Sequence, residues 1–300
     1  MNNIKKIIVT GGRGFIGSHF VKKALEKGMI VYDIDKMTYA SNKILPWDCH
    51  KNYTLIKKDI SEIDYLPSCD VILNFAAESH VDNSIRISDV FVKSNIIGVH
   101  NLLELVRNKA SYERPLFIQI STDEVYGDCL SGHFTESDRL LPSNPYSATK
   151  AAAEMLVLSY HRTYGIDYVI TRSGNNYGER QFEEKLIPKC ISSIREGKEI
   201  PVHGDGSYIR DWTYVGDNID AIFKLIESGC KNDIYNIAAE NYLTNLEVVS
   251  TMIEWLGAGS YTFVENRKGQ DLRYAVDCEK IKKLGWEPQH NKGLYKWKEF

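Results

Sequence analysis

Short apolar runs alternate along the chain with longer stretches in which apolar and polar residues mix at helical spacing. The runs cover residues 7–9, 30–34, 53–56, 71–75, 117–120 and 168–171. Helical patterns lie between them, for example up to residue 27 and over 96–106. Strands that alternate with helices predict an α/β fold built on a doubly wound parallel sheet.

The pattern changes at about residue 173, where loops broken by short helices begin. Residues 217–227 and 234–238 look like a helix and a strand that return to the main sheet. We therefore expect a main domain over 1–172, with returning elements near 213–240. Residues 173–300 are expected to form mainly a smaller substrate-binding domain.

A glycine-rich turn, residues 11–17, directly follows the first strand and precedes a helix. Gly11 permits a tight turn, Gly14 lets the backbone approach a pyrophosphate, and Gly17 allows the helix to pack closely on the strand. The anion then meets free N–H groups at the start of the helix. An ordinary glycine-rich turn is the alternative, but the position between strand and helix favours a Rossmann dinucleotide site.

The second strand ends at Asp35, where a ribose-binding carboxylate is expected. A carboxylate there repels a 2′-phosphate and so favours NAD over NADP, although Lys36 could weaken that repulsion. Asp33 is interpreted as an acid on the turn without a role in binding. Ligands of such sheets bind at the carboxyl ends of the strands. The predicted cofactor-binding residues are Gly11, Gly14, Phe15, Ile16, Gly17, Asp35, Lys36, Asp59, Ile60, Ala76, Ala77, Tyr146 and Lys150.

Tyr146 and Lys150 stand four residues apart in a predicted helix and so share one face. An ammonium near a phenol lowers the pKa of the phenol toward a value useful for proton abstraction. Upstream, Thr122, Asp123 and Glu124 add a hydroxyl and two carboxylates. A surface pair and an acidic loop are the alternatives, but together these residues predict a redox site that also holds an acid and a base.

Composition limits the remaining function classes. The chain has 300 residues, of which 43% are hydrophobic and 26% charged, and a net charge of −3 argues against a nucleic-acid surface. No apolar run approaches the roughly 20 residues that span a bilayer, and no signal-peptide pattern is seen, so we expect a cytoplasmic protein with no membrane partner. The six cysteines lack Cys-x-x-Cys spacing. His80, near Glu78 and Asp82, is more typical of a substrate contact than of a metal ligand, so we expect no metal.

The chain resembles the extended short-chain dehydrogenase/reductase family and, within it, the nucleotide-diphosphate-sugar 4,6-dehydratases. The resemblance spans residues 5 to about 297. It is carried by TGGxGFIGSH at 10–19, IDKxTYA at 34–40, AAESHVD at 76–82, STDEVYG at 121–127, NPYSATK at 144–150, NNYG at 175–178, EKLIP at 184–188, IRDW at 209–212 and DxRY at 271–274. The Asp-Glu step in the fourth motif separates these enzymes from related epimerases.

The resemblance implies NAD-dependent dehydration of a nucleotide-diphosphate glucose, with dTDP-glucose expected most and UDP-glucose possible. Oxidation at C4 makes the C5 proton acidic, and water then leaves across C5 and C6. Tyr146 would be the base for the oxidation, Lys150 would hold the phenolate and the nicotinamide ribose, and Thr122 would hydrogen-bond the same oxygen. Glu124 would take the C5 proton, and Asp123 would protonate the leaving 6-hydroxyl.

The substrate contacts that the resemblance implies are His80, Asn176, Lys185, Leu186, His203, Arg210, Asn236, Arg267 and Gln270. Arg210 is a candidate diphosphate clamp because a guanidinium fork suits phosphate oxygens, the alternative being an ion pair with Asp211. Gln270 replaces a family histidine. His203 stands where dTDP-sugar enzymes often place tyrosine, which leaves the nucleobase open.

Two other functions stay open at this point, a nucleotide-sugar 4-epimerase and a non-catalytic nucleotide-sugar binding protein. Assembly is suggested by apolar positions in the helices over 96–106 and 147–164 that exceed one core-facing stripe. These positions are Ile97, Leu103, Met155, Val157 and Leu158. Relatives pair these two helices across a two-fold axis, so we expect a homodimer.

Overall fold

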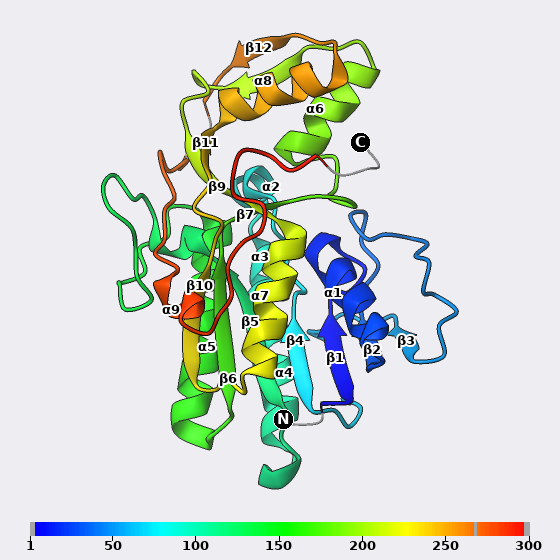
Figure 1. Ribbon diagram of the computed structural model, residues 1–300. Helices are drawn as coiled ribbons and strands as arrows, with labels where there is room; N and C mark the ends of the chain where they lie inside the picture. Colours follow the sequence, from blue (N-terminus) through cyan, green and yellow to red (C-terminus); the bar gives the residue numbers. More distant parts are fainter. Residues whose placement is uncertain (1–3, 267–268, 297–300) are drawn as a thin grey trace.

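A seven-stranded parallel sheet forms the centre of the computed structural model, which describes residues 4–266 and 269–296 (Figure 1). The strand order is β10-β6-β5-β4-β1-β2-β3. The strands are β1 (Lys6–Thr10), β2 (Ile30–Ile34), β3 (Tyr53–Ile56), β4 (Val71–Asn74), β5 (Leu116–Thr122), β6 (Tyr168–Ser173) and β10 (Asp233–Ile237). The predicted doubly wound fold is confirmed, and each predicted apolar run lies in or overlaps one of these strands.

Helices cover both faces of the sheet because its central strands are apolar on both sides. In β1, Ile7 and Val9 pack with α1 (Phe15–Glu26) and α7 (Val215–Glu227). Ile8, between them, faces the opposite way and packs with α4 (Gly98–Arg107) and α5 (Pro145–Tyr164). β2 and β3 follow β1 on one side of it, whereas β4 and the later strands lie on its other side. In a sheet of this kind the ligand crevice lies where the strand order reverses, between β1 and β4.

Helix α5 begins where its sequence dictates. Asn144 caps the helix, accepting a hydrogen bond from the Ser147 amide at 2.9 Å, and Pro145 occupies the first turn, where its missing N–H costs nothing. The helix ends at Gly165, whose φ of 68° is a left-handed cap. Tyr146 therefore lies in the first turn, beside the carboxyl end of β5.

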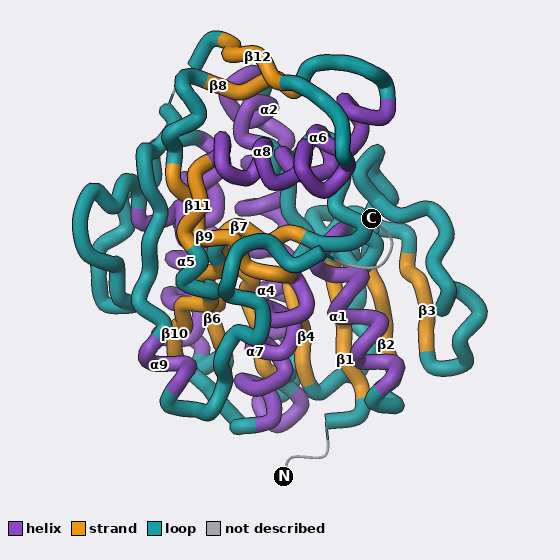
Figure 2. Tube along the Cα trace, turned by 45° about the horizontal axis from the view of Figure 1, so that its top comes forward, coloured by secondary structure: helices purple, strands orange, loops and turns teal. Residues whose placement is uncertain are grey.

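A smaller layer lies above the carboxyl ends of the strands, whose direction the arrows in Figure 1 give, and Figure 2 shows the same layer from another side. It contains the three-stranded sheet β11-β9-β7 and the two-stranded sheet β12-β8. Its own apolar core includes Tyr177, Ile200, Trp212 and Met252. Its elements are β7 (Asn175–Tyr177), α6 (Leu186–Arg195), β8 (Ile200–His203), β9 (Ile209–Tyr214), β11 (Tyr242–Thr244), α8 (Asn245–Leu256) and β12 (Tyr261–Val264). The domain division at residue 172 stays a prediction.

Between these parts, α7 and β10 return to the main sheet, β10 pairing in parallel with β6. The remaining short elements are α2 (Val81–Arg86), α3 (Asp89–Val92), the π-helix η1 (Lys93–Ile97), the 3₁₀ turns η2 (Ser111–Glu113) and η3 (Asp123–Tyr126), and α9 (Glu279–Lys282). The helix predicted over 96–106 thus begins earlier, as α3 and η1, and continues as α4. Within the described residues, no helix is long and apolar enough to cross a membrane.

Candidate active site

A first cavity of about 230 Å³ opens at the carboxyl ends of the central strands. All thirteen predicted cofactor-binding residues line it, from the glycine turn after β1 to Tyr146 and Lys150 on α5. Sequence reasoning missed other lining residues, among them Thr38, Ser41, Lys58, Ser94, Ser121 and Phe182. Thr38 and Ser121 stand inside motifs that were quoted, whereas Ser41, Lys58, Ser94 and Phe182 lie outside every quoted motif.

The glycine turn has the shape that a pyrophosphate needs. Gly11 has a φ of +69°, and a Cβ on it would lie 2.8 Å from the Ala76 backbone. A Cβ on Gly17 would lie 2.3 Å from the Gly11 carbonyl oxygen, so only glycine lets the helix approach the turn. Gly14 caps α1 without a side-chain hydrogen bond, which leaves the first-turn N–H groups facing the cavity. The residues therefore fit a dinucleotide.

Asp35 and Lys36, just after the end of β2, both line this cavity. The Asp35 carboxylate accepts hydrogen bonds from the amides of Arg13 at 3.0 Å and Met37 at 2.7 Å, which fixes its orientation. Lys36 donates to Ser94 and forms an ion pair with Glu78 at 2.9 Å. Because Glu78 already neutralises Lys36, the arrangement favours a free ribose hydroxyl over a 2′-phosphate.

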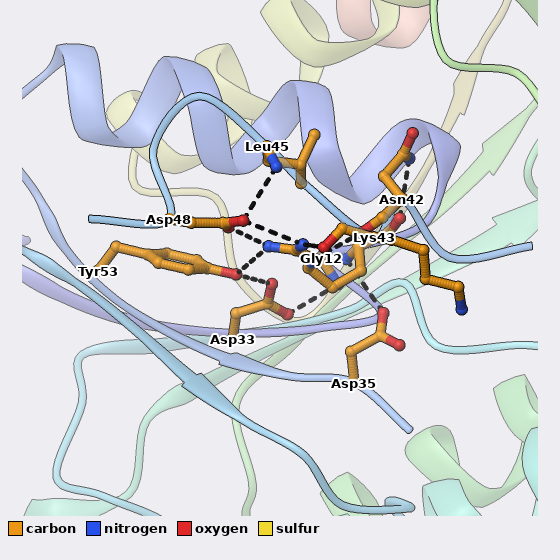
Figure 3. A network of polar contacts seen from close by, with 9 residues as sticks. Gly12, Asp33, Asp35, Asn42, Lys43, Leu45, Asp48 and Tyr53 are labelled. Atoms are coloured by element: carbon orange, nitrogen blue, oxygen red, sulfur yellow. Dashed lines mark hydrogen bonds and ion pairs between the residues drawn. The ribbon is translucent and has the colours of Figure 1, made fainter. Parts of the chain in front are cut away.

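Next to the glycine turn lies a polar network that the sequence did not reveal; Figure 3 shows Gly12, Asp33, Asn42, Lys43 and Asp48 within it. Arg13 makes most of its contacts. The Arg13 side chain is 1% exposed and pairs with Asp48, and it donates to the carbonyl oxygens of Asn42 at 2.9 Å and Lys43 at 2.7 Å. These contacts hold the loop that follows β2 against the glycine turn.

Asp33, interpreted from the sequence as a turn acid, is fully buried beneath this network. It accepts from the Gly12 amide at 2.9 Å and from the Tyr53 hydroxyl at 2.7 Å. Burial raises the pKa of Asp33 to about 7, the two hydrogen bonds opposing the shift. Its role is to support the turn.

The Tyr146 phenol and the Lys150 ammonium lie where the sequence predicted, but the expected effect on the phenol is wrong. Burial, followed by the charges of Glu124 and Asp123, raises the pKa of Tyr146, and a hydrogen bond with Thr122 opposes the rise. Lys150 instead donates to the Ile120 carbonyl oxygen, and its own pKa falls to about 8 because it is buried. Spacing along a helix shows proximity, but it does not show the cost of desolvation.

Behind Lys150, Glu154 and Arg172 form a buried ion pair at 2.7 Å. Glu154 lies one turn further along α5, and its charge raises the pKa of Lys150 against the effect of burial. Arg172 donates to both Glu154 oxygens and also to the Tyr126 hydroxyl at 2.7 Å. This pair keeps a negative charge near Lys150 and so favours its ammonium form.

Asp123 and Glu124, directly after β5, have different surroundings. Burial and the charges of Glu124 and Asp211 raise the pKa of Asp123 well above its usual range. Burial also raises the pKa of Glu124, but Arg210, Lys185 and a hydrogen bond from Asn144 all favour its carboxylate. Two carboxyls whose environments differ in this way can serve as acid and base respectively.

A second cavity of about 430 Å³ adjoins the first, and Ser79, Gln181, Glu184 and Lys185 line both. Of the predicted catalytic residues, Glu124 lines this cavity, Tyr146 and Lys150 line the first, and Thr122 and Asp123 line neither. The predicted substrate contacts that line it are His80, Asn176, Lys185, Leu186, His203, Arg210 and Gln270. A nucleotide sugar in this cavity would have its sugar beside Glu124 and its base toward β8.

Arg210 is held without a carboxylate partner among the described residues. It donates to the backbone carbonyl oxygens of Ile209 at 2.7 Å and Asp271 at 2.8 Å, and its guanidinium lies 4.2 Å from the Tyr274 ring centroid. The ion pair with Asp211 that the sequence left open is therefore wrong. The charge of Arg210 remains available to the cavity.

Two predicted substrate contacts require comment. Asn236 does not line the cavity: it is fully buried, accepts from the Tyr126 hydroxyl at 2.8 Å, and donates to the carbonyl oxygens of Phe134 and Asp277. Its amide groups are thus used within the protein, and the prediction is corrected. Arg267 lies outside the described residues. Arg273 donates to the carbonyl oxygens of Cys129 and Gly132, so it supports a loop.

Residues that sequence reasoning missed in the second cavity include Asn144, Lys189, Asn245, Val249 and Tyr274. Asn144 and Tyr274 stand inside motifs that were quoted, so those motifs carried a signal for them. Within residues 4–266 and 269–296, no cluster of three or more His, Cys, Asp or Glu side chains could hold a metal ion.

The parallel sheet with its glycine turn and Tyr-Lys helix agrees with the extended short-chain dehydrogenase/reductase class that the sequence resembles. The family model for GDP-mannose 4,6-dehydratase matches residues 8–293, and the chain belongs to this family.

Individual relatives extend over nearly the whole chain. The chain is 45% identical over 292 residues to the low-salt glycan biosynthesis protein Agl12 of Haloferax volcanii, covering 94% of this chain and 93% of that protein. It is 41% identical to the dTDP-glucose 4,6-dehydratase of Haemophilus influenzae, covering 94% and 93%. The structure of DesIV, a dTDP-glucose 4,6-dehydratase from Streptomyces venezuelae with NAD bound, aligns with a TM-score of 0.90 and 39% identity, covering 95% of this chain and 92% of that one.

Proposed function

We propose that this protein is an NAD-dependent hydro-lyase that converts a nucleotide-diphosphate glucose, dTDP-glucose first among them, into its 4-keto-6-deoxy product. The observation that carries the proposal is the pair Asp123 and Glu124. Glu124 lines the second cavity and Tyr146 the first, while Asp123 is buried next to Glu124 in the chain. The two carboxyls have environments that favour opposite protonation states. Only an elimination that follows oxidation needs both an acid and a base at this place.

Each catalytic side chain has a defined task. Tyr146 takes the proton of the 4-hydroxyl, and Thr122 hydrogen-bonds the same oxygen. NAD, held by the residues of the first cavity, would supply the hydride acceptor for C4 and the hydride donor for C6. Lys150 holds the phenolate and the ribose. Glu124 removes the C5 proton, which the C4 ketone has made acidic, and Asp123 protonates the departing 6-hydroxyl.

The raised pKa of Tyr146 indicates what the binding of NAD must contribute. The phenol is buried beside two carboxyls, so it stays protonated until positive charge comes near it. The oxidised nicotinamide ring carries such a charge. The phenolate should therefore form in the complex with NAD and substrate, rather than in the protein alone.

The substrate diphosphate is assigned to Arg210 and Lys185, which line the second cavity. Lys185 precedes α6 and Arg210 lies on β9, so the two cations approach the cavity from different elements. The nucleobase is assigned to the far end of that cavity, where Pro201 and His203 of β8 lie. His203 is fixed there through Nδ1, 3.0 Å from the Glu265 carbonyl oxygen.

A 4-epimerase would use the same Tyr146 and Lys150 and the same 4-keto intermediate. It needs no base at C5 and no acid at the 6-hydroxyl. Burying Asp123 and Glu124 together costs free energy, which an epimerase would have no reason to incur. A non-catalytic binding protein is disfavoured because it would not need the aligned Thr122, Tyr146 and Lys150.

Product analysis with dTDP-glucose, UDP-glucose and GDP-mannose tests the proposal. A 4-keto-6-deoxy product from a nucleotide-diphosphate glucose is expected, and recovery of the C4 epimer alone would refute the proposal. Tyr146→Phe should form no reduced cofactor in a single turnover. Glu124→Gln should accumulate it, because oxidation proceeds while C5 deprotonation is blocked; equal signals from both variants would contradict the assigned roles.

A homodimer in the cytoplasm completes the proposal. Of the apolar positions that suggested assembly, Leu103 and Val157 are buried in the core, which corrects that part of the argument. Ile97 and Met155 are each 49% exposed. Val90 and Val92, on the neighbouring α3, are also exposed. A mass near 34 kDa by light scattering at micromolar concentration would refute the dimer.

A further inference from the structure

Asp211 is a buried carboxyl that the proposed mechanism does not use. It lies on β9 and is fully buried, and Asp123 is 2% exposed. Within the described part of the chain, Oδ2 of each of these two residues is buried without a hydrogen-bond partner. Two orphaned carboxyl oxygens at one end of the sheet require an explanation, because leaving such a group unpaired is costly.

The strand register shows how Asp211 comes near Asp123. Thr122 pairs with Ser173 at the end of β5 and β6, so Asp123 and Gly174 are the next residues along two adjacent strands. A Cβ on Gly174 would lie 3.4 Å from the Asp211 Cβ and 3.2 Å from its carbonyl oxygen. The absence of a side chain at position 174 lets β9 approach this end of the sheet closely.

Hydrogen bonds determine which of the two carboxyls carries a proton. Oδ1 of Asp211 accepts from the amides of Ala239 at 3.1 Å and Asn241 at 3.4 Å, and such bonds stabilise a carboxylate. Among the residues that the structure describes, Asp123 accepts a side-chain hydrogen bond only from the Thr122 hydroxyl, at 3.2 Å. Two carboxyls close together in a buried site do not both ionise at neutral pH, so the proton belongs to Asp123.

Other charged or titratable groups face this pair. Tyr242 lies opposite Asp211 in the β9–β11 register, and Cys278 and Glu240 interact electrostatically with it. Burial raises the pKa of Asp211 to about 6, so it is a carboxylate at pH 7 and above. On the cavity side, Glu124 favours the acid form of Asp123 and Arg210 opposes it. Asp211 therefore counteracts a cation that would otherwise favour ionised Asp123.

We propose that Asp211 is a positioning residue for the elimination: its carboxylate keeps the proton on Asp123, so that Asp123 meets the 6-hydroxyl as an acid. This inference rests on the proposed function. In the step, the C5 proton passes to Glu124, the C6–O bond breaks, and the Asp123 proton leaves with that oxygen as water. Glu124 later returns its proton to C5. Tyr146 releases to solvent the proton that it took from the 4-hydroxyl, and Asp123 takes a proton back from solvent.

Asp211→Asn tests this role, because the amide keeps the acceptor oxygen and removes the charge. Without that charge the pKa of Asp123 falls, so the acid is lost at lower pH. In single turnovers of dTDP-glucose, the rise of reduced cofactor should be unchanged. The reduced cofactor then decays as elimination is completed. In the variant, the rate of this decay should begin to fall at a pH about one unit or more lower than in the wild type. With a 6-fluoro-6-deoxy substrate, whose leaving group needs less protonation, the defect should shrink.

Asp217→Asn is the control, since Asp217 is also buried and accepts from two backbone amides, those of Gln289 and His290. Unlike Asp211, it also contacts a side-chain partner, Nδ1 of His290, at 2.9 Å. In Asp217→Asn, the decay rate of reduced cofactor should fall at the same alkaline pH as in the wild type. The inference would be overturned if the decay rate in Asp211→Asn fell at the same pH as in the wild type. It would also be overturned if the variant slowed the formation and the decay of reduced cofactor equally. If wild-type protein forms no 4-keto-6-deoxy product at all, the proposed function fails instead.

An infrared measurement decides the matter if Asp211→Asn does not fold. Wild-type protein at pH 7.5 should show a carboxylic-acid carbonyl band that disappears in Asp123→Asn. Finding no such band in the wild type would show that Asp123 is ionised, which overturns the inference without any change at position 211.

Discussion

Replacing Glu154 by Gln should destabilise the protein strongly, although the change is nearly isosteric. Glu154 is fully buried and Arg172 is 3% exposed, and three guanidinium hydrogen bonds of 2.7–3.2 Å join them. An amide offers one acceptor oxygen and no charge, so the guanidinium would remain buried without a counter-charge. Breaking a buried pair in this way costs about 3–5 kcal/mol.

The expected cost can be converted into a melting temperature. At about 2–4 °C per kcal/mol for a large domain, the loss corresponds to roughly 6–20 °C. Thermal unfolding followed by circular dichroism measures it directly. Glu196→Gln is the control, because Glu196 forms a 2.7 Å pair with Lys198 in which both side chains are more than half exposed. Solvent screens such a pair, so the control should melt with the wild type.

The same substitution should also change the oxidation step. Glu154 raises the pKa of Lys150, so its loss should move that pKa below its present value of about 8. Formation of reduced cofactor in Glu154→Gln should then decline at lower pH than in the wild type. A variant that melts together with Glu196→Gln would refute the reasoning about the buried pair. An unmoved pH profile would refute the link to Lys150.

Three further predictions concern the cofactor and the base. Arg13→Lys keeps the positive charge but loses the guanidinium fork that joins Asp48 to the loop carbonyl oxygens. NAD should therefore bind about 10–100-fold more weakly, as measured by calorimetry. An unchanged affinity would show that other contacts hold the loop. In the wild type, formation of reduced cofactor should fall as pH rises through about 8, where Lys150 loses its proton; a stopped-flow rate that is flat across this range would contradict the assignment. dTDP-glucose and UDP-glucose should both react, with kcat/KM values within about two orders of magnitude of each other. In competition kinetics, His203→Tyr should shift the ratio of the two kcat/KM values toward dTDP-glucose. Complete rejection of either substrate, or an unchanged ratio in the variant, would contradict the role of His203.

The strands and the glycine turn were predictable because their signals are local. A fully buried parallel strand reads as a continuous apolar run, and a close approach of backbone to backbone requires glycine at fixed spacing. The candidate catalytic side chains could be located for a related reason, since they stand in short motifs at the end of β5 and the start of α5; their roles stay a prediction.

The remaining features depend on contacts between distant segments. Arg13 meets Asn42, Lys43 and Asp48 some 29–35 residues along the chain, and no local pattern indicates that meeting. Asn236 matched the family but is used inside the protein. The pKa of Tyr146 follows from burial, which helical spacing does not reveal.

Transfer of a deuterium label tests the central claim most directly. dTDP-glucose carrying deuterium at C4 is incubated with the protein and NAD, and the product is analysed by mass spectrometry and NMR. Dehydration through C4 oxidation and hydride return predicts a 4-keto-6-deoxy product with the label at C6. Label retained at C4 in a product that keeps its 6-hydroxyl would contradict the account and identify epimerisation instead.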